Sequence, residues 1–124
     1  MNVGSTAGFQ AGPFMAVYYA TKAYVISLSE ALANELTGSG VSVSCLCPGP
    51  TVTEFADTAK MGNALMFRLG PMTAQHVAEA GYRGFRRGKV LIVPGLLNYL
   101  GSMGVRFVPR SLARAIARRL QWEK

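Results

Sequence analysis

The stretch from Met15 to Leu36 is the feature that most constrains the fold of this chain. It contains neither proline nor glycine, and mostly apolar residues recur every four positions along it. This spacing places them on one face of an amphipathic helix. The next four residues, Thr37–Gly40, include two glycines, which supply the backbone freedom that commonly ends a helix. The sequence therefore predicts a long helix over Met15–Leu36.

Two later segments of the sequence have the pattern of buried strands. The run Val41–Cys47 alternates β-branched residues and is stopped by Pro48, and the run Lys89–Val93 is stopped by Pro94. Between them, residues 73–87 carry a helical pattern with Thr73 as its N-cap. Residues 1–4 resemble the last part of a further strand. Strands that alternate with helices indicate an α/β fold with a parallel sheet.

The two cysteines, Cys45 and Cys47, fall two positions apart in one of these strands, so their side chains share a face. A C-x-C pair with a single distant histidine, His76, does not make up a zinc ligand set. We therefore expect no metal site. The pair is interpreted as buried free thiols, which favours a reducing, cytoplasmic location.

A tyrosine and a lysine lie one helical turn apart on the long helix, at Tyr18 and Lys22. Residues four apart share a helix face, so the ammonium group can lie beside the phenol. A free phenol has a pKa of about 10, and a nearby cation favours its charged form, which is the direction that proton transfer at neutral pH requires. Ser5, from a separate segment, could donate a hydrogen bond to a substrate oxygen. This spacing also occurs by chance on many surface helices.

The surrounding residues make the pattern more specific. Three segments occur in order at Asn2–Gly8 (NVGSTAG), Tyr18–Ala23 (YYATKA) and Cys47–Thr53 (CPGPTVT). Together they resemble the short-chain dehydrogenase/reductase family, firmly over residues 2–53 and loosely beyond. The resemblance implies a Rossmann-type doubly wound parallel sheet.

The resemblance also implies a role for each matching residue in the interconversion of a carbonyl and an alcohol. Tyr18 would be the catalytic acid/base, Lys22 would lower its pKa and bind the nicotinamide ribose, and Ser5 would polarise the substrate carbonyl. The cofactor would be NAD or NADP, a choice that this sequence does not fix. Its nicotinamide end would meet Pro48, Gly49, Val52 and Thr53.

The segment Glu54–Gly70 corresponds in the family to a flap over the substrate. Here it is rich in methionine, leucine and phenylalanine. Because methionine adapts to irregular apolar partners, such a flap would favour an apolar carbonyl or alcohol substrate. Simple packing of these side chains on the sheet is an equal alternative.

The sequence departs from the family pattern at one important point. Family members carry a glycine-rich turn that binds the cofactor pyrophosphate at a helix N-terminus, and no such turn is present here. On this basis we expect the C-terminal half of a reductase, inactive by itself. An alternative is a non-catalytic fragment or interaction module that uses the long helix and the C-terminal tail. A nucleotide-sugar epimerase also uses Tyr and Lys at this spacing, although the Pro48–Thr53 loop favours a reductase.

The C-terminal segment has a distinct composition. Residues 1–95 are expected to form the Rossmann-type part, and residues 96–124 an apolar and basic helical tail. Eleven of the thirteen Lys and Arg residues lie after Met66, against two of the six acidic residues. From Pro109 on, arginines flank an apolar stripe. This helix would either dock on its own domain or lie peripherally on an anionic membrane.

The sequence also limits which kinds of partner are expected. Aromatic residues are not interleaved with the arginines and no nucleic-acid-binding module is recognised, so nucleic acid is not an expected partner. No apolar run approaches the length of about 20 residues that spans a bilayer. In the family, the helix with the tyrosine and lysine commonly packs against its counterpart, so a homo-oligomer formed through Met15–Leu36 is expected.

Overall fold

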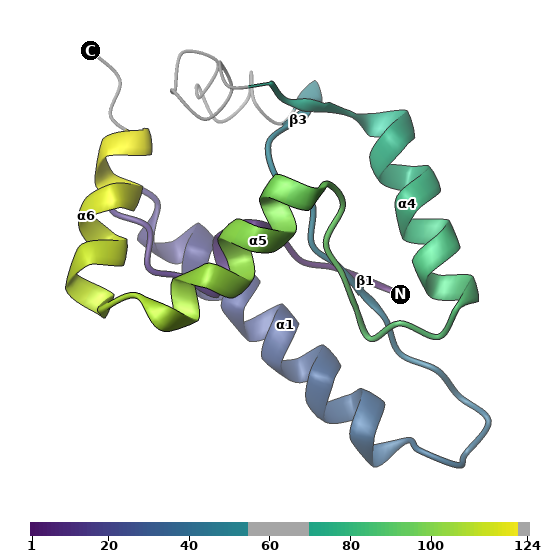
Figure 1. Ribbon diagram of the computed structural model, residues 1–124. Coiled ribbons are helices and arrows are strands. Elements are labelled where there is room, and N and C mark those ends of the chain that lie inside the picture. Colours follow the sequence, from purple (N-terminus) through teal and green to yellow (C-terminus); the bar gives the residue numbers. More distant parts are fainter. Residues whose placement is uncertain (55–69, 122–124) are drawn as a thin grey trace.

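The computed structural model describes residues 1–54 and 70–121 (Figure 1). Its main sheet has three parallel strands in the order β1–β2–β5. These are β1 (Asn2–Val3), β2 (Cys45–Leu46) and β5 (Leu91–Ile92), with Cys45 paired to Asn2 on one side and to Leu91 on the other. The predicted α/β class with a parallel sheet is confirmed, and the strand before Gly4 is present.

The predicted helices form nearly where the sequence places them. Helix α1 spans Ala16–Glu35, one residue shorter at each end than predicted. Helix α4 spans Ala74–Arg86, and the Thr73 hydroxyl accepts a hydrogen bond from the His76 backbone N–H at 3.2 Å, which confirms the N-cap. A short 3₁₀ helix, η1 (Thr6–Phe9), connects β1 toward α1.

The strands are shorter than the sequence predicts. The run Val41–Cys47 contributes only two residues to the ladder, Cys45 and Leu46, and Val41 is exposed. A second parallel pair was not predicted: β3 (Thr51–Val52) lies beside β4 (Met72–Thr73). Two-residue strands carry no period-two pattern, so sequence reasoning cannot find them. Strand β4 continues directly into helix α4.

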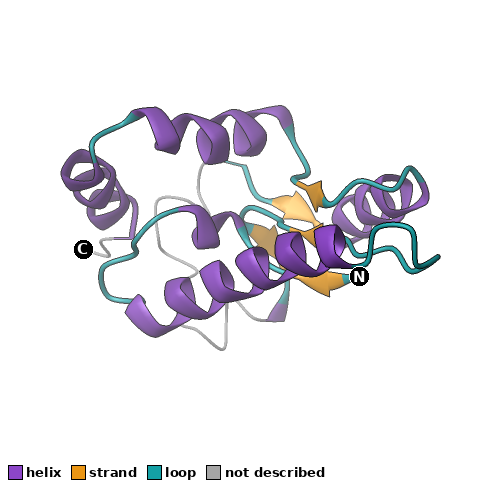
Figure 2. Ribbon diagram, turned by 90° about the horizontal axis from the view of Figure 1, so that it is seen from below, coloured by secondary structure: helices purple, strands orange, loops and turns teal. Residues whose placement is uncertain are grey.

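The core lies on both faces of the main sheet. On the α1 face, Ile26 packs with Cys45 and Cys47, and on the α4 face Leu46 packs with Val77 and Ile92. Alternate residues of one strand point to opposite faces, which explains this division. Figure 2 shows the strands enclosed between helices.

The two thiols are fully buried and free, as predicted. Their sulfur atoms lie 3.7 Å apart. The hydrogen bond that Cys47 shares with Cys45, together with burial, raises the pKa of the Cys47 thiol. That thiol is therefore protonated at neutral pH and behaves as a core residue.

The C-terminal segment folds back toward η1 and the first part of α1 (Figure 1). It consists of α5 (Leu96–Gly104), η2 (Val105–Phe107) and α6 (Arg110–Gln121). Ala113 and Ala117 of α6 are buried, and the Arg118 guanidinium lies 5.6 Å from the centre of the Phe14 ring. The basic helix is thus docked on its own chain, which is one of the two arrangements considered from sequence. Membrane contact stays a prediction.

The predicted substrate flap falls almost entirely on residues 55–69, outside the described part of the chain. Within the described residues, no helix combines the length and the apolar character that a membrane crossing needs.

The end of α6 is fastened to α1 by a buried pair. The Gln121 side-chain amide donates a hydrogen bond to the Tyr19 hydroxyl, 102 positions away in sequence. Burial raises the pKa of Tyr19 above its ordinary value of 10.0, and the hydrogen bond from Gln121 opposes only part of this shift. Because the folded state favours the neutral phenol, its contribution to stability is complete below pH about 10 and is lost as the pH rises through the folded pKa.

We therefore expect the free energy of unfolding to fall between pH 9 and pH 11 more steeply in the wild type than in Tyr19→Phe. Urea titrations at several pH values measure both slopes. Tyr24→Phe is the matched control, since Tyr24 lies on the same helix and is 67% exposed. Equal slopes for wild type and Tyr19→Phe would show that the buried Tyr19 phenol is not the source of this pH dependence.

Candidate active site

Ser5 lies directly after β1, where the chain turns into η1. It is 9% exposed, and its hydroxyl oxygen accepts a hydrogen bond from the Ala7 backbone N–H at 3.1 Å. This bond uses an acceptor position of the oxygen, so the hydroxyl proton can still be donated to another group. The N-cap geometry of η1 thus fixes Ser5 while leaving its donor available.

Tyr18 and Lys22 lie on the first turns of α1. The Lys22 ammonium is 5.7 Å from the centre of the Tyr18 ring, and it donates a hydrogen bond to the Val3 carbonyl at 3.1 Å. That bond ties the lysine to the end of β1, the strand that also leads into Ser5. One of the three ammonium donors is used in this way, and two are left for other partners.

A glycine allows the serine and the helix to come together. A Cβ atom on Gly8 would lie 2.7 Å from the Lys22 carbonyl oxygen and 2.5 Å from a methyl carbon of Ile26. No side chain fits between η1 and α1 at this point. The absence of a side chain at Gly8 therefore sets how closely Ser5 approaches the face of α1 that carries Lys22.

The loop after β2 completes the same region. The Thr6 backbone N–H donates to the Pro48 carbonyl at 2.9 Å, which holds this loop beside Ser5. Pro48, Gly49 and Thr53 line a cavity that Ser5 also lines. Val52, the fourth residue that the resemblance places at the nicotinamide end, is 62% exposed and is not part of that lining.

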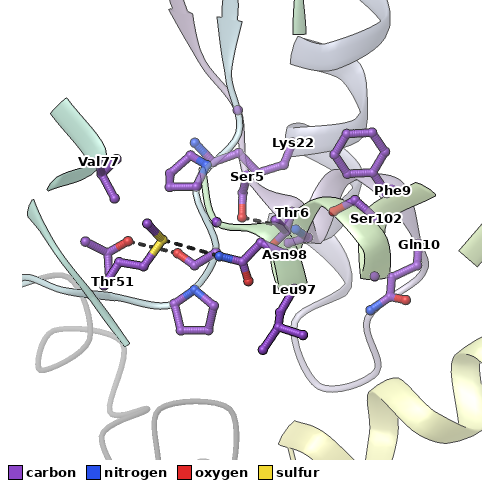
Figure 3. Close-up of a pocket in the computed structure, with 18 of the residues that line it drawn as sticks. Ser5, Thr6, Phe9, Gln10, Lys22, Thr51, Val77, Leu97, Asn98 and Ser102 are labelled. Carbon is purple, nitrogen blue, oxygen red and sulfur yellow. Dashed lines mark hydrogen bonds between the residues drawn. The ribbon is translucent and has the colours of Figure 1, made fainter. Parts of the chain in front are cut away.

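The cavity has a volume of about 1200 Å³. Its lining includes Ser5, at the N-cap of η1, and Tyr18 and Lys22 of α1. Figure 3 shows Ser5 and Lys22 above the α5 residues Asn98 and Leu97, with Ser102 of the same helix to the right, beside Phe9.

Sequence reasoning missed the contribution of α5. The Asn98 side-chain amide donates to the Pro94 carbonyl at 2.9 Å, and a Cβ atom on Gly49 would lie 2.4 Å from the Asn98 amide oxygen. Gly49 is therefore also a packing residue, against which the start of α5 closes. The apolar composition of residues 96–108 was visible in the sequence, but nothing in it located the helix over the cavity.

The described residues contain no cluster of three or more possible metal ligands. The groups that this site offers are a buried hydroxyl, a phenol, an ammonium group and the backbone of the Pro48–Gly49 loop. Such a set can bind an oxygen atom of a substrate and move a proton at it. It is the set that the family motifs predict.

Comparison with known proteins decides the family. Residues 1–63, half of the chain, match the short chain dehydrogenase family. The chain belongs to that family. Over 84 residues it is 39% identical to the sulfoacetaldehyde reductase of Chromohalobacter salexigens, an alignment that spans 64% of this chain and 33% of the relative.

Solved structures of the family extend the match. A short-chain dehydrogenase from Sphingobium yanoikuyae in complex with NADPH is 29% identical, with a TM-score of 0.69, and the alignment covers 99% of this chain and 47% of that one. A short chain dehydrogenase from Burkholderia cenocepacia, in complex with NADP, shares the fold at 22% identity and a TM-score of 0.71 over 98% of this chain. The chain thus spans about half the length of these structures.

These findings correct one expectation. From sequence, we described the chain as only the C-terminal half of a family member, with a resemblance that weakens after residue 53. The family match instead covers the N-terminal part of the chain, residues 1–63, and the structural alignments run over almost all of it. The family motifs lie within residues 2–53. The helices after them match the solved structures in their arrangement, although the sequence identity is low.

The close approach at Gly8 generates a direct test. Gly8→Ala must push η1 away from α1, because the added Cβ would meet backbone atoms that cannot rotate aside. Overpacking of this kind costs about 1–3 kcal/mol of stability. Urea unfolding measures it. Gly101→Ala is the control, since a Cβ there meets nothing within 4 Å and alanine in a helix interior should be neutral or stabilising. A Gly8→Ala protein as stable as Gly101→Ala would show that the contact is not tight.

Proposed function

We propose that the protein is an oxidoreductase that interconverts a carbonyl and an alcohol with NAD or NADP. The observation that carries the proposal is the convergence of Ser5, Tyr18 and Lys22 on one cavity, from η1 and α1. Family membership supports it, as does the NADPH complex of the Sphingobium yanoikuyae relative.

In the reduction direction, the substrate carbonyl oxygen would lie between Ser5 and Tyr18. Ser5 donates a hydrogen bond to that oxygen, because a carbonyl oxygen can only accept and the Ala7 N–H occupies an acceptor position of the hydroxyl, which leaves its proton to donate. As negative charge develops on the oxygen, the Tyr18 hydroxyl donates its proton and the alcohol is formed. In the oxidation direction the same phenol oxygen accepts the alcohol proton.

Lys22 would stabilise the charged form of this phenol. Its ammonium group is held near the Tyr18 ring by the bond to the Val3 carbonyl, so its position is fixed before substrate binds. Preorganised charge of this kind needs no rearrangement at the moment of reaction. The two remaining donors of Lys22 are available to hydroxyl groups of a ribose.

The cavity fits the nicotinamide end of a dinucleotide. Lys22 supplies donors for a ribose, and the turn at Pro48–Gly49, with Thr53 beyond it, offers polar backbone and a hydroxyl along one wall. The cofactor, when bound, supplies or takes up the hydride. The protein residues orient it and handle the proton. The residues of this site do not distinguish NAD from NADP.

The proposal is tested by Tyr18→Phe, which keeps the ring and removes the oxygen that carries the proton. We expect turnover of a panel of ketones and aldehydes to fall about 10²- to 10⁴-fold, the usual worth of general acid catalysis. The assay follows NADH or NADPH oxidation by the protein, expressed with any residues that its gene encodes ahead of Met1.

Tyr24→Phe on the same helix is the control, because Tyr24 is exposed and does not line the cavity. It should keep wild-type turnover. Circular dichroism and thermal unfolding establish that both variants fold. Turnover in Tyr18→Phe within twofold of wild type would refute the assignment of the acid/base.

A further inference from the structure

Asn98, near the start of α5, places an amide group in the wall of the active-site cavity. Its nitrogen donates hydrogen bonds to the Pro94 carbonyl at 2.9 Å and to the Met72 sulfur at 3.4 Å. Figure 3 shows Asn98 below Ser5, with a dashed line from the amide nitrogen to that sulfur. Because a carbonyl oxygen can only accept, the nitrogen is the end of the amide that faces Pro94, and the orientation of the group is fixed.

The oxygen is the end of this amide that can serve a ligand. An amide nitrogen carries two hydrogen atoms, and at Asn98 each of them has an acceptor within the protein. The amide oxygen has two acceptor positions, and Asn98 is half-buried on the cavity wall. Asn98 therefore presents a hydrogen-bond acceptor whose direction is set before any ligand binds.

This amide lies directly on the turn after β2. A Cβ atom on Gly49 would lie 2.4 Å from the Asn98 amide oxygen, 2.5 Å from its nitrogen and 2.6 Å from its carbon. The amide group thus occupies the place that a side chain at Gly49 would take. In the proposed function, the same turn meets the nicotinamide end of the cofactor.

The turn itself offers few groups for a hydrogen-bond donor. All three carbonyls of Pro48–Pro50 already accept a hydrogen bond at 2.9 Å from within the chain, and the donors are the Thr6 N–H, the Thr51 hydroxyl and the Met72 N–H. Two of the three residues are prolines, which have no N–H to orient a ligand oxygen. A ligand NH₂ group that lies on this turn therefore needs an acceptor from another element, and the Asn98 oxygen is such an acceptor.

We propose that Asn98 recognises the carboxamide group of the nicotinamide ring, whose NH₂ group donates a hydrogen bond to the Asn98 oxygen. The inference rests on the proposed function, which places the nicotinamide end of NAD or NADP in this cavity. The carboxamide is the substituent that makes the two edges of the ring different, so a hydrogen bond to it determines which way round the ring lies. The C-terminal segment in this way contributes to cofactor binding.

The test compares two cofactors that differ at this one group and measures binding, not turnover. In 3-acetylpyridine adenine dinucleotide a methyl group replaces the NH₂ of the carboxamide, so the donor is lost while the size is kept. The reduced form and NADH are titrated calorimetrically into the protein, expressed with any residues that its gene encodes ahead of Met1. NADPH and its acetylpyridine analogue are titrated in the same way. We expect the tighter-binding natural cofactor to bind about five- to tenfold more tightly than its analogue.

Two variants of Asn98 separate the acceptor from the bulk of the side chain. Asn98→Leu keeps the approximate volume and removes the acceptor, so the affinities for cofactor and analogue should come within about twofold of each other. Asn98→Asp keeps an oxygen acceptor and should retain the preference for the natural cofactor. Each variant is compared with itself across two ligands, so a general loss of stability does not produce the expected pattern.

Asn34→Leu is the control, since Asn34 is exposed on α1 and does not line the cavity. It should keep the wild-type preference. Equal affinities for cofactor and analogue in the wild type, or a preference that survives Asn98→Leu, would overturn the proposal. A preference that survives Asn98→Leu and is lost in Thr53→Val would assign the carboxamide contact to Thr53 instead. If neither natural cofactor binds, the cofactor part of the proposed function fails and this inference fails with it, whereas equal binding of cofactor and analogue leaves the proposed function intact.

Discussion

The site depends on the contact between η1 and α1 at Gly8. There the two backbones approach so closely that a single Cβ atom would collide with the Lys22 carbonyl. The same approach brings Ser5, at the start of η1, to the helix face that carries Tyr18 and Lys22. The Lys22 bond to the Val3 carbonyl and the Thr6 bond to the Pro48 carbonyl then connect this unit to β1 and to the loop after β2. The close backbone approach at Gly8, together with the Lys22 side-chain bond, therefore defines the site.

The C-terminal segment turns this unit into a cavity. Asn98 closes on Gly49 at one end of the segment, and at the other end Arg118 lies over Phe14 and Gln121 bonds to Tyr19. These contacts hold α5 and α6 against both the Pro48–Gly49 loop and helix α1. The basic helix, for which the sequence left docking or membrane contact open, is thereby part of the cavity wall. Its arginines flank that wall without lining it.

Much of this arrangement could be predicted from the sequence. Helices α1 and α4 were found to within one or two residues, because their patterns are long and their ends are marked by Thr37–Gly40 and Thr73. Ser5, Tyr18 and Lys22 could be singled out because of their place in the family motifs; they line one cavity, and their roles stay predictions. The pair β3 and β4 could not be found, since its pairing is set by contacts between distant segments. For the same reason the sequence could not predict that Ser102 and Asn98 line the cavity, because this depends on where α5 packs. Val52 is exposed, and its contact with a cofactor stays a prediction.

The central claim is that Ser5 and Tyr18 both donate hydrogen bonds to one substrate carbonyl oxygen. Carbon-13 NMR of decan-2-one labelled at its carbonyl and bound to the protein measures this directly, because hydrogen bonds to the oxygen move the carbonyl resonance downfield. The account predicts a downfield shift on binding that decreases in Ser5→Ala, decreases in Tyr18→Phe and disappears in the double variant. A bound resonance at the position found in an apolar solvent, or one that the double variant leaves unchanged, would contradict it.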